Sequence, residues 1–199
     1  MKRNNCIFKK ALGIILVLAV CISLAGNSSV SRAASRYKIK VNKQKNCVTI
    51  YKMNANGKYK PVKAMVCSTG AATPVGTFPL GEKMRWHTLI GPCYGQYCTR
   101  IHGGILFHSV WYYKPSPSTL SSEAYNRLGT TASHGCVRLT VADAKWIYDN
   151  VPSGSPVTVY NSSKPGPLGK PSGIRLPSSS RWDPTDVWSS GNPWNKKKP

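Results

Sequence analysis

Short segments of alternating apolar and polar residues dominate the chain after residue 35, and they restrict it to a mainly β fold. Three such segments follow one another at residues 37–41, 47–52 and 61–68. The pair Asn56-Gly57 between the second and third is a dipeptide that tight hairpin turns favour. A period of two places every second side chain on the same face, so each segment can cover one side of a core. The sequence therefore predicts that the domain begins as an antiparallel β arrangement.

Further along the chain, strands mix with two short helices. Residues 84–100 are rich in Gly, Tyr and Cys without a clear period and are interpreted as a long loop or distorted hairpin that covers a site. Residues 101–110 are mostly apolar and predict one buried strand. Helices are predicted near residues 122–128 and just past Thr140, which has a spacing to a carboxylate like that of a capping box. Residues 156–160 supply a last strand.

Both ends of the chain differ in composition from this β region. Basic residues precede an apolar run at residues 11–25 and small residues follow it, which predicts a secretory signal over residues 1–33. An uncleaved anchor is the alternative, although the run is short for a membrane span. Residues 162–199 are dominated by Pro, Gly, Ser and Lys and predict a disordered tail. One domain over residues 34–161 remains, long enough for a modest core.

Basic residues greatly outnumber acidic ones, which indicates an anionic partner. The formal net charge is +22, and removing residues 1–33 takes five of the 28 basic residues and none of the six acidic ones, leaving +17. For an exported protein this charge favours anionic envelope polymers over nucleic acid, with solubility alone as the alternative explanation. Trp182, Trp188 and Trp194 recur every six residues in the tail. This spacing either presents rings to glycan strands or is a coincidence of linker composition.

Five cysteines lie outside the predicted signal, an odd number for a protein of an oxidising compartment. They are Cys47, Cys67, Cys93, Cys98 and Cys136. Two disulfides and one free reactive thiol would account for this count. Pairing Cys47 with Cys67 is reasonable because they lie on neighbouring predicted strands, and Cys93 and Cys98 flank a segment interpreted as tight. This pairing leaves Cys136 as the free thiol.

The thiol of Cys136 lies in a sequence suited to nucleophilic chemistry. Ser133-His134-Gly135-Cys136-Val137-Arg138 places it behind a glycine and between a histidine and an arginine. Cationic or proton-accepting neighbours lower the pKa of a thiol, and glycine lets a substrate carbonyl approach the backbone. The alternative is a small buried hydrophobe, a common role for free cysteine. His108, which follows an apolar strand and precedes Ser109, is the candidate base, and His134 is its competitor.

Together these motifs resemble the signature of the L,D-transpeptidase catalytic domain, the YkuD type. Phe107-His108-Ser109 and the Ser-His-Gly-Cys motif that begins at Ser133 carry the resemblance, and residues 73–78 are similar to a flanking landmark in the same order. The resemblance implies a mixed, mainly β sandwich with short helices. The distance between the two parts of the signature is longer than is usual in the family. An insertion within residues 112–126 is therefore expected, where it would shape the acceptor side, and His102 is a second possible base.

The resemblance also implies a two-step acyl transfer on peptidoglycan stem peptides. Cys136 would attack the third residue of a tetrapeptide stem, expel the terminal D-residue and form a thioester. An amine of a neighbouring stem would then release the acyl group as a 3→3 cross-link. His108 would accept the thiol proton with help from Ser109, and backbone N–H groups around His134 and Gly135 would form the oxyanion hole. The candidate substrate-binding residues are Arg138, Ser133, Tyr94 and Trp111.

The same resemblance sets the expected partners and the alternatives. No cofactor is expected, and the Cys and His spacing is not that of zinc ligands. The expected partners are stem peptides and anionic wall polymers, without nucleic acid, for a secreted, wall-associated monomer that contacts the membrane only transiently through its signal segment. Two other functions remain open, namely an L,D-carboxypeptidase or endopeptidase that hydrolyses the same thioester, and a non-catalytic cell-wall-binding module. Exclusion of water from the acceptor subsite separates transferase from hydrolase.

Overall fold

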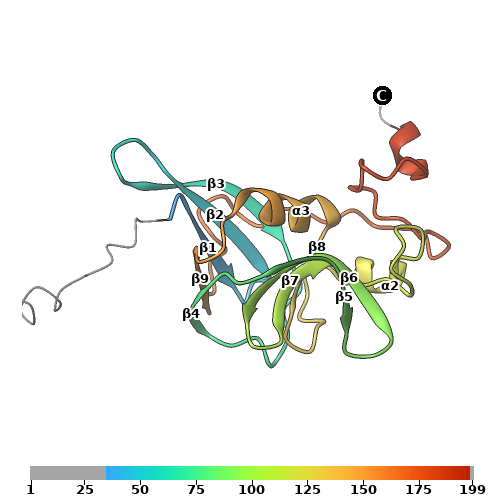
Figure 1. Cartoon of the computed structure of the whole chain (residues 1–199), viewed down its shortest axis with the longest axis horizontal. Helices are drawn as coiled ribbons and strands as arrows, with labels where there is room; N and C mark the ends of the chain where they lie inside the picture. The colour runs from blue at the N-terminus through green and yellow to red at the C-terminus, as the bar shows by residue number, and fades with distance from the viewer. Residues whose placement is uncertain (1–34, 198–199) are drawn as a thin grey trace, which may run out of the picture. The chain divides into compact units, whose positions relative to one another are not determined.

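Two β-sheets and two short α-helices form the fold, which a computed structural model describes for residues 35–197 (Figure 1). The predicted signal segment, residues 1–33, lies outside the described residues. Five strands form one sheet in the order β3-β2-β1-β9-β4, and four form the second in the order β5-β6-β7-β8. Both sheets contain parallel and antiparallel pairs. The predicted mixed, mainly β fold with short helices is confirmed.

The bounds of most elements agree with the sequence prediction. The first sheet contains β1 (Tyr37–Asn42), β2 (Cys47–Met53), β3 (Tyr59–Val66), β4 (Gly76–Pro79) and β9 (Pro156–Tyr160). The second sheet contains β5 (Lys83–Leu89), β6 (Cys93–His102), β7 (Ile105–Ser109) and β8 (Val137–Leu139). The helices are α2 (Ser122–Asn126), α3 (Val141–Asn150) and a short 3-10 helix, η1 (Pro193–Lys197). No helix within residues 35–197 is long and apolar enough to cross a membrane.

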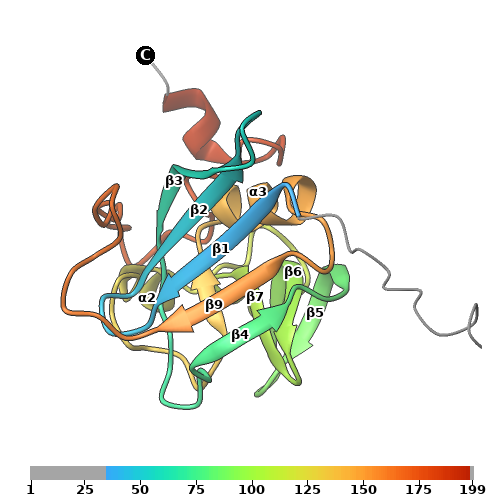
Figure 2. The same ribbon diagram turned by 90° about the vertical axis from the view of Figure 1, so that its left-hand side faces the viewer.

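The core lies between the two sheets, and α3 closes it. Alternation in β1 buries Ile39 and Val41 and leaves Lys38 and Lys40 partly exposed. Helix α3 packs against β6 and β7, and its Trp146 meets a tyrosine ring of β1 edge-on at 5.6 Å. Figure 2 shows the opposite, outer face of the first sheet with no helix over it. The buried faces of both sheets and the helix therefore surround one core.

The region from residue 84 to 110 contains three strands, in place of the predicted loop and single strand. Strands β5 and β6 form an antiparallel hairpin, which agrees with the hairpin alternative for residues 84–100. The prediction of one strand over residues 101–110 is wrong, because β6 ends at His102 and β7 begins at Ile105. Gly103 between them has a positive φ of 51°, which glycine adopts at little cost. The turn was not predicted because Ile101 before the Gly103-Gly104 pair and residues 105–107 after it were interpreted as one apolar strand.

Residues 162–197 pack against the domain, so the prediction of a disordered tail is wrong for them. Leu176 is buried in the core. Asp183 is fully buried, and its carboxylate accepts the Val141 N–H in the first turn of α3 at 2.9 Å. The N–H of Leu120 donates to the Arg181 carbonyl at 2.9 Å. This packing could not be predicted from composition. The segment has almost no regular secondary structure, and its hydrogen bonds go to residues on distant elements.

The three evenly spaced tryptophans do not form one exposed array. Trp188 is 52% exposed. Trp194 packs against the core, and Trp182 lies against Gly191. The hypothesis that the spacing presents three rings to a glycan is therefore not supported.

None of the five described cysteines is in a disulfide. Cys93 and Cys98 lie five positions apart on the extended strand β6, which separates their Cα atoms by about 16 Å, beyond the reach of a disulfide. The interpretation of this segment as a tight turn was wrong. Cys47 and Cys67 do lie close together, because Cys47 pairs with Val66 across β2 and β3, yet their thiols are free. Cys136 is therefore one of five free thiols in the described residues, and disulfide pairing does not distinguish it from the other four. Its role has to be judged from the site.

Asp183 should make stability depend on pH in the direction opposite to that of most carboxylates. Burial raises its pKa to about 6, against hydrogen bonds from Thr185 and Val141. The folded state thus binds the Asp183 proton more tightly than the unfolded state does. The stability that this protonation contributes is fully present below about pH 4 and is lost as pH rises to 6. We expect the free energy of unfolding in urea to fall by on the order of 3 kcal/mol over this interval.

The matched variant Asp183→Asn keeps an oxygen acceptor for Val141 and cannot ionise. Its stability should lack this fall between pH 4 and 6. Identical pH profiles for the two proteins would show that Asp183 does not titrate in this range.

Candidate functional site

A cavity of about 520 Å³ brings together the two parts of the sequence signature. It opens between the β5–β6 hairpin, the start of β7 and residues 133–138. The predicted site residues that line it are Cys136, His108, His134, Gly135, Ser133, Arg138 and Trp111. Tyr94 does not line it and instead pairs with Tyr112 through backbone hydrogen bonds. Tyr94 is therefore not placed as the pocket wall that was predicted.

Parallel pairing of β7 with β8 explains why the three main side chains share one cavity. His108 is paired with Arg138 in register. Cys136 lies in a bend directly before β8, two positions from Arg138, and lines the same cavity. The long connection between the two strands, residues 110–136, brings them side by side. The site is thus built on a rigid strand pair.

The imidazole of His108 is held with one nitrogen free to accept a proton. Its Nδ1 lies 2.5 Å from the Ser109 carbonyl oxygen, and since a carbonyl only accepts, Nδ1 carries the hydrogen. Burial lowers the pKa of His108 to about 4, aided by the charges of Arg138 and His87 and opposed by the Ser109 bond. The ring is therefore neutral near pH 7, with Nε2 as its acceptor atom. Ser109 contributes its carbonyl, whereas its hydroxyl donates to Val110 at 2.8 Å.

His102, the second possible base, lies outside the cavity. Its ring stacks on Phe78 with the centroids 4.6 Å apart, and it does not line the cavity. The geometry therefore favours His108.

The surroundings of Cys136 favour its protonated thiol. Its Sγ donates to the Gly104 carbonyl at 3.6 Å. Burial raises the pKa of Cys136, and a Leu106 backbone hydrogen bond, Arg138 and Arg100 lower it only in part. The expected net lowering of this pKa is therefore not found. With His108 also neutral, a resting thiolate–imidazolium pair is unfavourable.

Backbone N–H groups of the motif point away from the loop that supports it. The carbonyl of His134 accepts from the Ala72 N–H at 3.0 Å, and the carbonyl of Gly135 accepts from the Thr73 hydroxyl at 2.7 Å. In a trans peptide the N–H points opposite to its carbonyl, so the N–H groups of Gly135 and Cys136 point away from residues 70–73. The sequence prediction that these N–H groups form an oxyanion hole is compatible with this orientation and stays a prediction.

Gly70 permits this close support. A Cβ added at Gly70 would lie 2.2 Å from the Ser133 carbonyl oxygen, too near for any side chain. The supporting loop therefore requires glycine where it meets the motif.

Arg138 both steadies the motif and faces the cavity. Its Nη1 donates to the Ala132 carbonyl at 2.8 Å. Its Nε is buried and has no hydrogen-bond partner within residues 35–197. Arg138 also lines the cavity, so its charge lies beside any acidic or carbonyl group that binds there.

Several residues of the cavity were missed by sequence reasoning. His87 and Cys93 come from the β5–β6 hairpin and line the cavity. Because the sequence analysis did not resolve β5 and β6 as paired strands, the pairing that brings His87 opposite Gly95 was not predicted. By contrast, residues 112–126, expected to shape the acceptor side, do not line the cavity, and only the preceding Trp111 does. No group of three or more His, Cys, Asp or Glu side chains in the described part of the chain is arranged to hold a metal ion.

Gly95→Ala should displace the side chain of His108. A Cβ at Gly95 would lie 2.8 Å from His108 Nδ1 and 3.0 Å from its Cβ, so the imidazole has to move. Because such a displacement breaks the Ser109 bond, we expect turnover to fall about 10²-fold. Gly173→Ala is the matched control, since nothing lies within 4 Å of its added Cβ. Equal turnover of both variants and the parent protein would contradict this role of Gly95.

Comparison with known proteins agrees with the geometry. Residues 36–159, more than half of the chain, match the family model for the L,D-transpeptidase catalytic domain, YkuD. The chain belongs to this family. In sequence, this L,D-transpeptidase-family chain is 44% identical over 92 residues to a Bacillus subtilis (strain 168) protein named "Putative L,D-transpeptidase YciB". That match covers 44% of this chain and 46% of YciB, so the chain spans about half the length of the curated relative it matches.

One solved L,D-transpeptidase structure supports the same fold, and a second is reported beside it. LdtMt1 in complex with imipenem gives a TM-score of 0.50 at 23% identity, covering 63% of this chain and 59% of that protein. An L,D-transpeptidase from Mycobacterium smegmatis gives a TM-score of 0.49 at 21% identity, with the same coverage of 63% and 59%.

Proposed function

We propose that this chain is an L,D-transpeptidase that cleaves a peptidoglycan tetrapeptide stem through a thioester on Cys136 and transfers the acyl group to an amine. One observation carries the proposal, namely that Cys136 and His108 share a cavity in which His108 keeps Nε2 free as an acceptor. Family membership supports the class of reaction.

In the first step, Sγ of Cys136 attacks the carbonyl carbon of the third stem residue while Nε2 of His108 takes the thiol proton. The carbonyl electron pair moves to oxygen, where the N–H groups of Gly135 and Cys136 stabilise it, each donor being worth about 3 kcal/mol. Collapse of this intermediate breaks the C–N bond to the terminal D-residue. His108 returns its proton to the departing amine, and a thioester remains.

In the second step, a neutral amine of a neighbouring stem attacks the thioester and gives its proton to His108. The C–S bond breaks, an amide forms, and the sulfur recovers the proton. Water in place of the amine yields a tripeptide, so the acceptor decides between transfer and hydrolysis.

The test is to incubate the purified protein with a disaccharide-tetrapeptide and to analyse protein and products by mass spectrometry. A protein adduct that lacks the mass of the terminal residue, together with a 3→3 cross-linked dimer, is the expected result. Tripeptide alone would assign a hydrolase. Unchanged substrate and no adduct, with protein that is folded by circular dichroism, would contradict the proposal and leave the wall-binding alternative.

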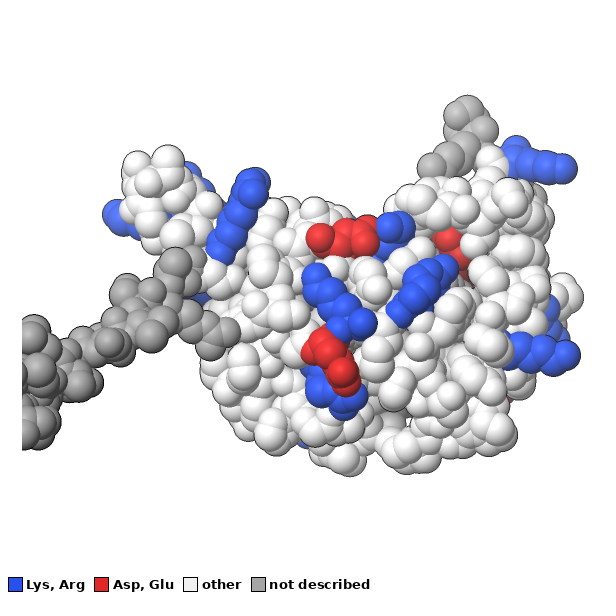
Figure 3. Space-filling view, in the orientation of Figure 1, with Lys and Arg blue, Asp and Glu red and all other residues white. Residues whose placement is uncertain are grey.

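We also propose that the protein is secreted and bound to anionic wall polymers, through the outer face of the first sheet. Residues 36–79 and 156–160 supply all five strands of that sheet and contain nine basic residues and no acidic one. On that face Lys38 lies over the rings of Tyr51 and Tyr59, and Lys40 over Tyr51. The face seen in Figure 3 differs, because acidic side chains lie among basic ones there. Lys63 pairs with Asp143 of α3, and the other basic residues of these segments have no acidic partner within residues 35–197, so the sheet offers a polyanion a face of one sign of charge.

The double variant Lys38→Gln, Lys40→Gln should bind a phosphate-rich wall polymer more weakly. We expect the salt dependence of binding to decrease by about one per lysine removed. Lys114→Gln with Lys196→Gln is the matched control of equal charge change, placed away from the sheet. Equal losses in the two double variants would point to net charge and contradict a specific face.

A further inference from the structure

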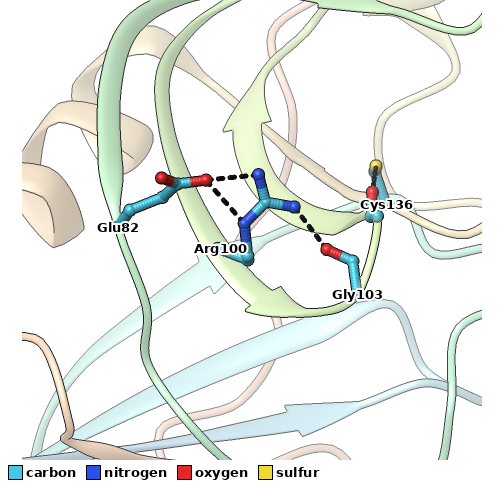
Figure 4. A network of polar contacts seen from close by, with 5 residues as sticks. Glu82, Arg100, Gly103 and Cys136 are labelled. Atoms are coloured by element: carbon cyan, nitrogen blue, oxygen red, sulfur yellow. Dashed lines mark hydrogen bonds and ion pairs between the residues drawn. The ribbon is translucent and has the colours of Figure 1, made fainter.

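An arginine beside the cavity connects a surface carboxylate to the turn that touches the nucleophile. Arg100 of β6 donates from Nε to the Glu82 carboxylate at 2.8 Å, and its Nη2 contacts the same oxygen. Its Nη1 donates to the Gly103 carbonyl (Figure 4). Backbone bonds reinforce this arrangement, because the Arg100 N–H donates to the Glu82 carbonyl at 2.9 Å. Both ends of the guanidinium are therefore held.

The next residue of the same turn touches the catalytic thiol. Gly104 follows Gly103, and its carbonyl accepts the Cys136 thiol at 3.6 Å. The two carbonyls belong to consecutive peptide units, so an anchor on the first restricts the second. Gly103 has a φ of 51°, and nothing would lie within 4 Å of a Cβ at either glycine, so side-chain packing does not hold this turn. Arg100 is the side chain that donates to it.

We propose that Arg100 is a positioning residue, which fixes the β6–β7 turn so that Gly104 holds the Cys136 thiol in place, with Glu82 fixing Arg100 in turn. Arg100 does not line the cavity, so it acts through the turn and does not touch substrate. This inference rests on the proposed role of Cys136 as the nucleophile. It does not depend on the identity of the substrate.

The charge of Arg100 has an additional effect on the nucleophile. Arg100 lowers the pKa of Cys136, after the larger contributions of the Leu106 hydrogen bond and Arg138, and all three oppose the effect of burial. The other titratable or charged groups that neighbour Cys136 or line its cavity are Cys98, His108, His87, Cys93, His134 and Arg138. None of these is the group that anchors the turn. Loss of Arg100 should thus both loosen the thiol and disfavour its thiolate.

The test measures the rate at which iodoacetamide alkylates Cys136 between pH 6 and 10, followed on the Cys136 peptide by mass spectrometry. Arg100→Gln should slow alkylation roughly three- to tenfold at pH 7.5 and move the profile to higher pH. Arg100→Lys keeps the charge but not the fork that binds two partners at once, and Glu82→Gln weakens the anchor. Because the Gly104 carbonyl accepts from the thiol and so stabilises its protonated form, each of these variants should speed alkylation about twofold. Asp149→Asn, which alters the exposed Lys145–Asp149 pair of α3, is the matched control and should have no effect.

An unchanged profile in folded Arg100→Gln would overturn the proposal, and so would a lowered melting temperature with an unchanged profile, because that is a merely structural role. A wild-type rate in both Arg100→Lys and Glu82→Gln would overturn the positioning through the turn. Alkylation needs no peptidoglycan. The proposed function can therefore fail in its own test while these measurements still decide the role of Arg100.

Discussion

Cys136→Ala should abolish the covalent adduct and reduce turnover of a tetrapeptide stem by at least about 10⁴-fold. In the proposed mechanism the sulfur forms the thioester, and neither His134 nor Arg138, which also line the cavity, offers a group that could replace it. Any residual turnover would come from the oriented N–H groups and from substrate binding. The measurement is the rate of product formation, together with intact-protein mass spectrometry.

A matched histidine pair extends this experiment to the base. His108→Gln removes the acceptor atom inside the cavity and should slow turnover about 10²- to 10⁴-fold. His102→Gln changes a ring that stacks on Phe78 outside the cavity and should leave turnover near that of the parent protein. A covalent adduct in Cys136→Ala would disprove that Cys136 is the nucleophile. A greater loss of turnover in His102→Gln than in His108→Gln would make His102 the base instead of His108.

Truncation after residue 161, the boundary that composition suggested, should destabilise the domain severely. It removes Leu176 from the core and the Asp183 carboxylate from the first turn of α3. Loss of a buried leucine costs about 2–5 kcal/mol and loss of a helix cap about 1 kcal/mol, against a total stability of about 5–15 kcal/mol. We therefore expect the midpoint of urea unfolding to fall sharply, or the truncated chain not to fold.

Two point variants test whether lost core packing causes the destabilisation that truncation should produce. Leu176→Ala should lower the free energy of unfolding by about 2–5 kcal/mol. Trp188→Ala, in the same segment at a side chain that is 52% exposed, should change it by less than about 0.5 kcal/mol. A truncated protein with the stability of the full chain would show that residues 162–197 rest on the domain without supporting it.

The sequence sufficed for those parts of the fold and site that local patterns determine. Alternation predicted β1, β2 and β3, and a capping residue predicted the start of α3 at Thr140, whose hydroxyl accepts the Asp143 N–H at 3.2 Å. The motif around Cys136 and the strand that carries His108 were identified because their residue types are chemically distinctive. Family resemblance then supplied the mixed topology, which includes parallel pairs that no local pattern indicates.

The remaining features depend on contacts between distant residues. The role of Arg100 requires knowing that the β6–β7 turn meets Cys136, which lies 32 positions beyond Gly104. The pKa of Cys136 depends mainly on burial, which the residues next to it in the sequence do not indicate. Burial raises this pKa by more than the cationic neighbours lower it. Packing of residues 162–197 depends on single contacts such as that between Asp183 and Val141, within a segment whose composition is typical of linkers.

A neutral resting thiol also bears on the chemical durability of the enzyme. Peroxides and disulfides react with the thiolate and scarcely with the protonated sulfur, so a cysteine held protonated oxidises slowly. Cys136 donates a hydrogen bond to the Gly104 carbonyl through its S–H, and burial keeps its pKa raised. For a protein proposed to act outside the cytoplasm, the sulfur proposed as its nucleophile would thus stay reduced between turnovers without a reducing partner, and its working lifetime would shorten as the surrounding pH rises.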